Sequence, residues 1–359
     1  MKLLRSIFLL LLVGFFCIDA QEEHWSYYDM GKFNIWDFLE WDNEKGYEVV
    51  SSSKEEQFFS SLGKQLKESG FTGIYLAFGQ MCNIDAYASG QFLDRTLQGD
   101  VVGLQIQQLQ EAQKKGSVDP KFSYLEWMIN SLHKQGLQVA FSFGGVNSSL
   151  SSFIPPENAS GYLLQMIEKY GLEGIDLDVE IALPPSTVEL LTSMINQVNA
   201  ARKSPSLFTL TLLASLTDNK NLLGMGFWLE NASSLFKGIN LMAYSETEYY
   251  IDADNPSWGI KEWIKEVKDA HLLRIGFYDA IAYEKSFGWD STQRGKSARI
   301  ILDNLCKALE ESGYCSTLGG TFWWPDEGMA HHHYDSPDNQ GDAPAFISAE
   351  QSQFYSTNS

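Results

Sequence analysis

The chain has 359 residues, and its 46 acidic and 26 basic side chains give a formal net charge of −20 at pH 7. This charge argues against nucleic acid or an anionic membrane as a partner, because both require a cationic surface. It is compatible with a neutral polysaccharide. The length suits one large domain or two small ones, and four cysteines are too few for a disulfide-dense scaffold. Cys306 and Cys315 are close enough in sequence to bridge, with Cys82 left over or competing.

The first twenty residues have the features of a secretory signal peptide. Lys2 and Arg5 precede an apolar run from Ile7 to Phe16, and Ala20 is a plausible cleavage point. The run is too short to span a membrane comfortably, and no second apolar segment of membrane length follows. We therefore expect a secreted, extracellular protein. Three sequons permit N-glycans if the source is eukaryotic: Asn147, Asn158 and Asn231.

Apolar segments of strand length alternate with segments of helical periodicity along most of the chain. We predict strands over 32–41, 71–79, 137–145, 172–180, 207–216, 239–244, 272–278 and 319–324. We predict helices over 54–69, 120–135, 161–170, 184–203, 258–270 and 297–311. The polar, Gln-rich segment 80–119 is interpreted as an extended loop with a short helix.

This alternation is typical of parallel βαβ units. Eight such units close into a (β/α)8 TIM barrel, whose chemistry lies at the C-terminal ends of the strands, and segment 80–119 would lie over that mouth. A doubly wound open sheet is the alternative, but no glycine-rich phosphate loop follows the first strand. We predict one α/β barrel domain over 21–330 and a polar C-terminal tail over 331–359.

The strand predicted at 172–180 carries three acids on one face. Alternation along a strand places Asp176, Asp178 and Glu180 together, and the opposite face is apolar (Ile175, Leu177 and Val179). Carboxylates only ~7 Å apart repel one another, so we expect raised pKa values and coupled titrations. A Ca²⁺ or Mg²⁺ site is the alternative, but its ligands usually surround a turn rather than line a straight strand. Acid–base catalysis is the favoured interpretation.

The same stretch resembles the Asp-x-x-Asp-x-Asp-x-Glu motif of glycoside hydrolase family 18. That family includes chitinases, endo-β-N-acetylglucosaminidases and inactive chitinase-like lectins. Asp176, Asp178 and Glu180 match the motif, and Glu173 stands where the first Asp would be. Glu173 lies at the strand start on the opposite parity, so we expect this departure to have a modest effect.

Three other strands extend the resemblance. Ser142-Phe-Gly-Gly145 is similar to the family's Ser-x-Gly-Gly element, and Met242-Ala-Tyr244 is similar to its Met-x-Tyr, with Ser245 where an Asp usually follows. Gly319-Gly-x-x-x-Trp324 resembles the closing strand, whose Trp floors the sugar site, and Trp323 takes that place if the register slips by one. The segment between Tyr278 and Gly319 is too short for the α+β insertion of many members, so we expect a shallower cleft.

The resemblance implies a retaining, substrate-assisted hydrolysis in which the acetamido oxygen of the sugar attacks its own anomeric carbon. It implies that Glu180 protonates the leaving oxygen and later deprotonates water. Asp178 would hydrogen-bond the acetamido N–H, and Asp176 would share a proton with Asp178. Tyr244 would hold the acetamido oxygen for attack. The residues expected to bind the sugar are Trp324, Met242, Ser142, Gly144 and Gly145. No cofactor and no metal is implied.

Three functions remain open on these residues. The first is a chitinase that cleaves β-1,4-linked N-acetylglucosamine polymers, and the second is an endo-β-N-acetylglucosaminidase that cuts N-glycan cores. The third is a non-catalytic chitinase-like lectin, although most such relatives lose the terminal acid that Glu180 supplies here. In each case the expected partner is an oligo- or polysaccharide containing N-acetylglucosamine, bound by a monomer.

Overall fold

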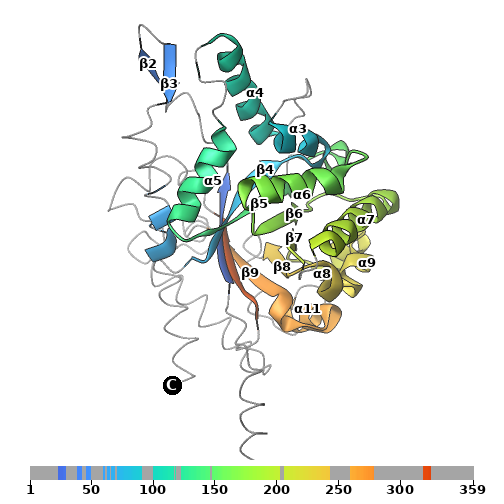
Figure 1. The fold of residues 1–359 in the computed structure, drawn as a ribbon. Helices are drawn as coiled ribbons and strands as arrows, with labels where there is room; N and C mark the ends of the chain where they lie inside the picture. The colour runs from blue at the N-terminus through green and yellow to red at the C-terminus, as the bar shows by residue number, and fades with distance from the viewer. Residues whose placement is uncertain are drawn as a thin grey trace, which may run out of the picture.

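The protein is described by a computed structural model over residues 23–29, 39–42, 46–49, 60, 63–64, 66–68, 71–90, 100–116, 118, 123–145, 148–202, 206–242, 259–278 and 318–324. Eight parallel strands close into a barrel in the order β1-β4-β5-β6-β7-β8-β9-β10 (Figure 1). Their bounds are β1 Glu23–Asp29, β4 Gly73–Gly79, β5 Gln138–Gly144, β6 Gly174–Asp178, β7 Phe208–Leu213, β8 Gly238–Met242, β9 Leu273–Tyr278 and β10 Gly320–Trp324. The predicted (β/α)8 barrel is confirmed.

The first barrel strand differs from the prediction. We expected it within 32–41, but β1 is Glu23–Asp29, which pairs with β4 on one side and β10 on the other. Residues Leu39–Asp42 form β2 instead, in an antiparallel hairpin with β3 (Gly46–Val49). β1 could not be recognised from an apolar run in the sequence, because most of its residues are polar. Only the alternate positions Trp25 and Tyr27 carry large apolar surface into the barrel.

Helices follow most of the strands. They are α3 (Ile84–Ser89), α4 (Val101–Lys114), α5 (Tyr124–Lys134), α6 (Ala159–Tyr170), α7 (Pro185–Arg202), α8 (Leu216–Asn221), α9 (Gly226–Glu230), α10 (Ala232–Leu235) and α11 (Ile260–Val267). Segment 80–119 is more helical than predicted, because α4 buries Val102, Ile106 and Leu109 in the core. Among the described residues, no helix has both the length and the apolarity to cross a bilayer.

Several predictions fall outside the described residues. These are the signal peptide, the helix at 297–311, the lack of an α+β insertion between β9 and β10 with its shallower cleft, and the tail at 331–359. The Cys306–Cys315 pairing also lies there.

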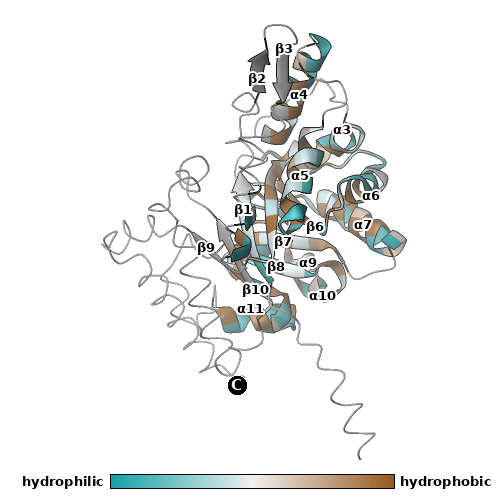
Figure 2. Ribbon diagram, turned by 60° about the vertical axis from the view of Figure 1, so that its left-hand side comes forward, coloured by the Kyte–Doolittle hydropathy of each residue, from teal (hydrophilic) through white to brown (hydrophobic). Residues whose placement is uncertain are grey.

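Two cores lie on the two sides of the barrel wall. The outward faces of the strands pack against the helices, and Figure 2 shows hydrophobic residues concentrated on the central strands while α6 and α7 alternate in hydropathy along their length. The barrel interior has its own small cluster, formed by Trp25, Tyr27, Tyr75, Ala77, Ala140, Met242 and Phe322. Because this interior is aromatic rather than aliphatic, its hydroxyl and indole groups can bind the polar side chains of the site.

Candidate active site

The fourth strand of the barrel, β6, carries the acids. It follows α6, which ends at Gly171 in the left-handed conformation (φ 70°) and turns the chain back toward the sheet. Ile175, Leu177 and Val179 are fully buried between strands and helices, as the alternation predicted. Asp176 and Asp178 therefore face the barrel interior, and Glu180 lies two residues beyond the end of β6 and is partly exposed.

Asp176 is held by four hydroxyl groups. Its Oδ2 accepts hydrogen bonds from Tyr27 (2.8 Å) and Ser142 (2.7 Å), and its Oδ1 accepts from Thr209 (2.7 Å) and Thr211 (2.9 Å). The pKa of the Asp176 carboxyl is raised above its ordinary value, because the effect of burial exceeds the opposing effect of the four hydroxyls. An ionised carboxylate has about four lone-pair sites, so these hydroxyls occupy its acceptor capacity.

Asp178 has the opposite surroundings. It is fully buried, and nothing in the described part of the chain hydrogen-bonds its Oδ1. Burial, followed by the charges of Glu180 and Asp176, raises the pKa of Asp178 well above its ordinary value. The sequence predicted raised, coupled titrations from mutual repulsion, but the larger cause is burial in the barrel. These surroundings favour the protonated form of the Asp178 carboxyl.

The strand register places the neighbours of these acids. Ser142 on β5 and Thr209 on β7 lie opposite Asp176, while Gly144 and Thr211 lie opposite Asp178. Ser142 is fully buried on Asp176, so it acts on a bound sugar only through that carboxylate.

Gly144 and Gly145 have positive φ values of 123° and 88°. A Cβ at Gly145 would lie 2.9 Å from the Phe78 ring, so this strand end has room only for glycine.

The remaining predicted site residues do not all lie near the acids, and some belong to the part of the chain that is not described. Met242 ends β8 inside the barrel, where it packs in the interior cluster and is 5% exposed. Trp324 is the last residue of β10, but its side chain does not belong to the described part of the structure. Tyr244 lies outside the described residues altogether. Glu173 lies at the N-terminal end of the barrel, where its Oε2 accepts from the Val139 amide.

Four residues that surround Asp176 were missed in the sequence. Tyr27, Thr209, Thr211 and Asn240 are all buried and point inward, and the Asn240 amide donates to Thr211 at 2.9 Å. A signal was present on β7, because Phe208-Thr-Leu-Thr-Leu212 alternates apolar and hydroxyl residues within a strand buried on both faces. Among the described residues, no group of three or more acidic, His or Cys side chains is arranged to hold a metal ion.

Solved structures with this fold were found by comparison. A glycoside hydrolase family 18 chitinase from Pseudoalteromonas aurantia is 13% identical, with a TM-score of 0.55 over 91% of this chain and 99% of its own. A class V chitinase from Nicotiana tobaccum is 13% identical, with a TM-score of 0.51 over 92% and 99%. A family 18 chitinase from Cycas revoluta, solved with (GlcNAc)3, is 14% identical, with a TM-score of 0.51 over 91% and 99%.

No protein-family model and no curated protein matches the chain in sequence. At these identities the likeness concerns the fold. The chain has the barrel fold of the glycoside hydrolase family 18 chitinases.

Proposed function

We propose that the protein is a secreted glycoside hydrolase that cleaves β-1,4-linked N-acetylglucosamine with retention of anomeric configuration. The observation that carries this proposal is that the surroundings of the three acids change from one to the next along β6. Asp176 is saturated with hydroxyl donors, Asp178 is buried with a raised pKa, and Glu180 is partly exposed beyond the strand end. A donor of protons beside a fixed anion is what acid-catalysed cleavage of a glycosidic bond requires.

The proton belongs to the pair of Asp178 and Glu180 in this proposal. The family resemblance implied that Asp176 shares it with Asp178, but the oxygens of Asp176 already accept hydrogen bonds from four hydroxyls. The Asp176 negative charge therefore stays in place and favours a proton on its neighbour. Glu180 is the group from which that proton reaches the leaving oxygen.

The reaction then proceeds without a nucleophile from the protein. The acetamido oxygen of the sugar attacks its anomeric carbon while Glu180 donates a proton to the glycosidic oxygen, which leaves as an alcohol. Asp178 accepts a hydrogen bond from the acetamido N–H and stabilises the positive charge of the oxazolinium. Glu180, now ionised, takes a proton from water as the water attacks the same carbon. The bond between that carbon and the acetamido oxygen breaks, which opens the oxazolinium ring and restores the acetamido group and protonated Glu180.

The test is hydrolysis of chitin oligomers of defined length beside a high-mannose glycopeptide, with the product anomer followed by proton NMR. The proposal expects cleavage of the oligomers with the β-anomer formed first. Cleavage of the glycopeptide alone indicates an endo-β-N-acetylglucosaminidase with the same chemistry. Tight oligomer binding by calorimetry without any product overturns the catalytic proposal in favour of a lectin.

A further inference from the structure

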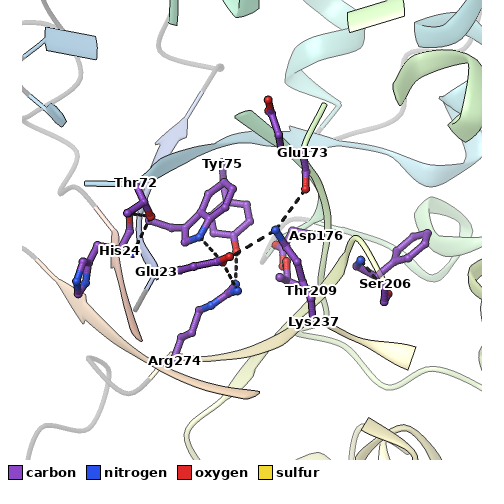
Figure 3. Close-up of polar contacts among 12 residues, drawn as sticks. Glu23, His24, Thr72, Tyr75, Glu173, Asp176, Ser206, Thr209, Lys237 and Arg274 are labelled. Atoms are coloured by element: carbon purple, nitrogen blue, oxygen red, sulfur yellow. Dashed lines mark hydrogen bonds and ion pairs between the residues drawn. The ribbon is translucent and has the colours of Figure 1, made fainter. Parts of the chain in front are cut away.

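A buried arginine lies below the acids, toward the N-terminal end of the barrel. Arg274 is the second residue of β9, and it is 2% exposed. Its Nη1 donates to the Tyr75 hydroxyl at 2.9 Å, and its Nη2 donates to the Glu23 carboxylate (Figure 3). Gly238 on β8 makes room for it, because a Cβ there would lie 2.6 Å from the Arg274 Cζ. The guanidinium is therefore a fixed cation inside the barrel.

Glu23 interacts with two other side chains besides Arg274. The same Oε2 accepts from the Trp25 indole at 2.9 Å and lies 4.0 Å from the Lys237 ammonium. Lys237 also lies over the Trp25 ring and donates to the Glu173 carbonyl oxygen at 3.3 Å. The Glu23 side chain is 31% exposed, so water screens part of its charge. Its neighbour His24 adds no cation at neutral pH, because burial and Arg274 lower its pKa to about 4.

Tyr75 connects this cation with the acids. Its hydroxyl accepts from Arg274, and Figure 3 shows Tyr75 close to Thr209 and Asp176. The Tyr75 hydroxyl also interacts with Thr209 and Asn240, two of the groups that surround Asp176. Burial raises the pKa of Tyr75 to about 12; Arg274 lowers it and Asp176 raises it, so the hydroxyl feels both charges. The Tyr75 ring also stacks on Tyr27 at 4.6 Å between centroids, and Tyr27 donates to Asp176.

We propose that Arg274 is a positioning residue that acts through Tyr75 to favour the ionised form of Asp176 and so keeps the catalytic proton on Asp178 and Glu180. The idea rests on the proposed function for its catalytic meaning. A guanidinium has donors only and stays charged, so the field that it exerts along the barrel axis has one sign at all working pH values. Arg274 touches neither the sugar nor the reacting atoms.

The charged and titratable groups that face Asp176 come from several strands. They are Tyr27 on β1, Tyr75 on β4 and Asp178 on β6, and Arg274 on β9 is linked to Asp176 through the Tyr75 hydroxyl. The other described neighbours are hydroxyl or amide groups that do not titrate: Ser142, Thr209, Thr211 and Asn240. On β10 the described inward side chain is Phe322, which is apolar. Arg274 is the cation that donates to the Tyr75 hydroxyl, and the charge of Asp176 acts on that same hydroxyl.

The test measures the titration of Asp176 itself, by carbon-13 NMR of protein labelled at aspartate carboxyl groups. Asp176→Asn assigns the signal. The proposal expects Arg274→Met to raise the midpoint by about 0.5–1 pH unit, as loss of an opposite charge does, and Arg274→Lys to keep most of the wild-type value. Lys220→Met removes an exposed cation paired with Glu266 on the outside of the barrel and should leave the midpoint unchanged.

Glu23→Gln gives a second reading with the opposite sign. It removes the anion next to Arg274, so the Asp176 midpoint should fall, which a mere loss of barrel stability does not produce. If Arg274→Met does not fold, the pair Arg274→Lys and Glu23→Gln still decides the matter. Midpoints that agree in all folded variants overturn the proposal.

Activity gives the catalytic consequence. In the proposed hydrolase the acidic limb of kcat/KM should move with the Asp176 midpoint in Arg274→Met, while KM stays near the wild-type value. If the wild-type protein hydrolyses none of the sugars, the proposed function fails. The Asp176 midpoints from NMR still test whether Arg274 favours the ionised form of Asp176.

Discussion

Gly144 on β5 lies so close to Asp178 on β6 that a Cβ at Gly144 would be 2.0 Å from the Asp178 carbonyl oxygen. The φ of Gly144 is 123°, a conformation that other residues rarely adopt. This contact brings the ends of the two strands together where β6 delivers its acids. The backbone of β5 thus forms one wall of the place where Asp178 is held.

Gly144→Ala is expected to lower the free energy of unfolding by about 2 kcal/mol or more, because it adds both a clash and backbone strain. It should also reduce activity by displacing Asp178. Urea denaturation and initial rates on a chitin oligomer measure the two effects. The matched control is Gly226→Ala, where a Cβ meets nothing within 4 Å. Equal stability of the two variants would contradict the close approach.

Glu180→Gln should lower kcat by about 10²–10⁴-fold, since it removes the general acid and base but keeps the shape of the side chain. Binding of a chitin oligomer by calorimetry should stay close to that of the wild type. A matched control is Glu189→Gln on α7, which lies on the outer face of the barrel. Turnover in Glu180→Gln at the wild-type rate would remove Glu180 from the acid role.

The raised pKa of Asp178 predicts a dependence of stability on pH. Its carboxyl holds a proton in the folded state at pH values where an unfolded aspartate, with a pKa of 3.8, has lost it. The folded state then binds more protons than the unfolded state, so Asp178 makes stability fall as the pH rises from about 4 through the raised value.

Asp178→Asn removes that dependence because its amide cannot ionise. Its free energy of unfolding should exceed that of the wild type by an amount that grows with pH, at up to about 1.4 kcal/mol per unit. Urea midpoints measured from pH 4 to 8 give the difference. Glu157→Gln, at an exposed position before α6, is the control and should give a flat difference. A flat difference for Asp178→Asn as well would mean that Asp178 is ionised in the folded protein.

Thr209→Val and Thr211→Val each remove one hydroxyl donor from Asp176 Oδ1 while keeping the shape of the side chain. Each should raise the apparent pKa of the acidic limb in the pH profile of kcat/KM. Each should also lower kcat by about tenfold, as expected for loss of about 1.5 kcal/mol from a charge-assisted hydrogen bond. KM should change little because neither threonine reaches the sugar. Thr217→Val on the exposed surface of α8 is the control, and the same kinetics in all three variants would exclude a role for the β7 hydroxyls.

The sequence alone determined the barrel and the face of β6 that carries the acids. Both follow from local periodicity: apolar runs of strand length between helical segments predict parallel units, and alternation along one strand places Asp176, Asp178 and Glu180 together. The first strand was misplaced because a strand that lines the barrel interior with Trp25 and Tyr27 lacks the long apolar run of its neighbours.

The tertiary structure alone decided what surrounds each acid. Tyr27, Ser142, Thr209 and Thr211 come from three strands that are far apart in sequence, and the register of the closed sheet brings them onto Asp176. The same closure leaves Asp178 buried, with no donor to its Oδ1 among the described residues, and places Arg274 beneath the acids. The ionisation of a carboxyl depends on burial and on charges within a few ångströms. Neighbours in space set both quantities, and they are not its neighbours in the chain.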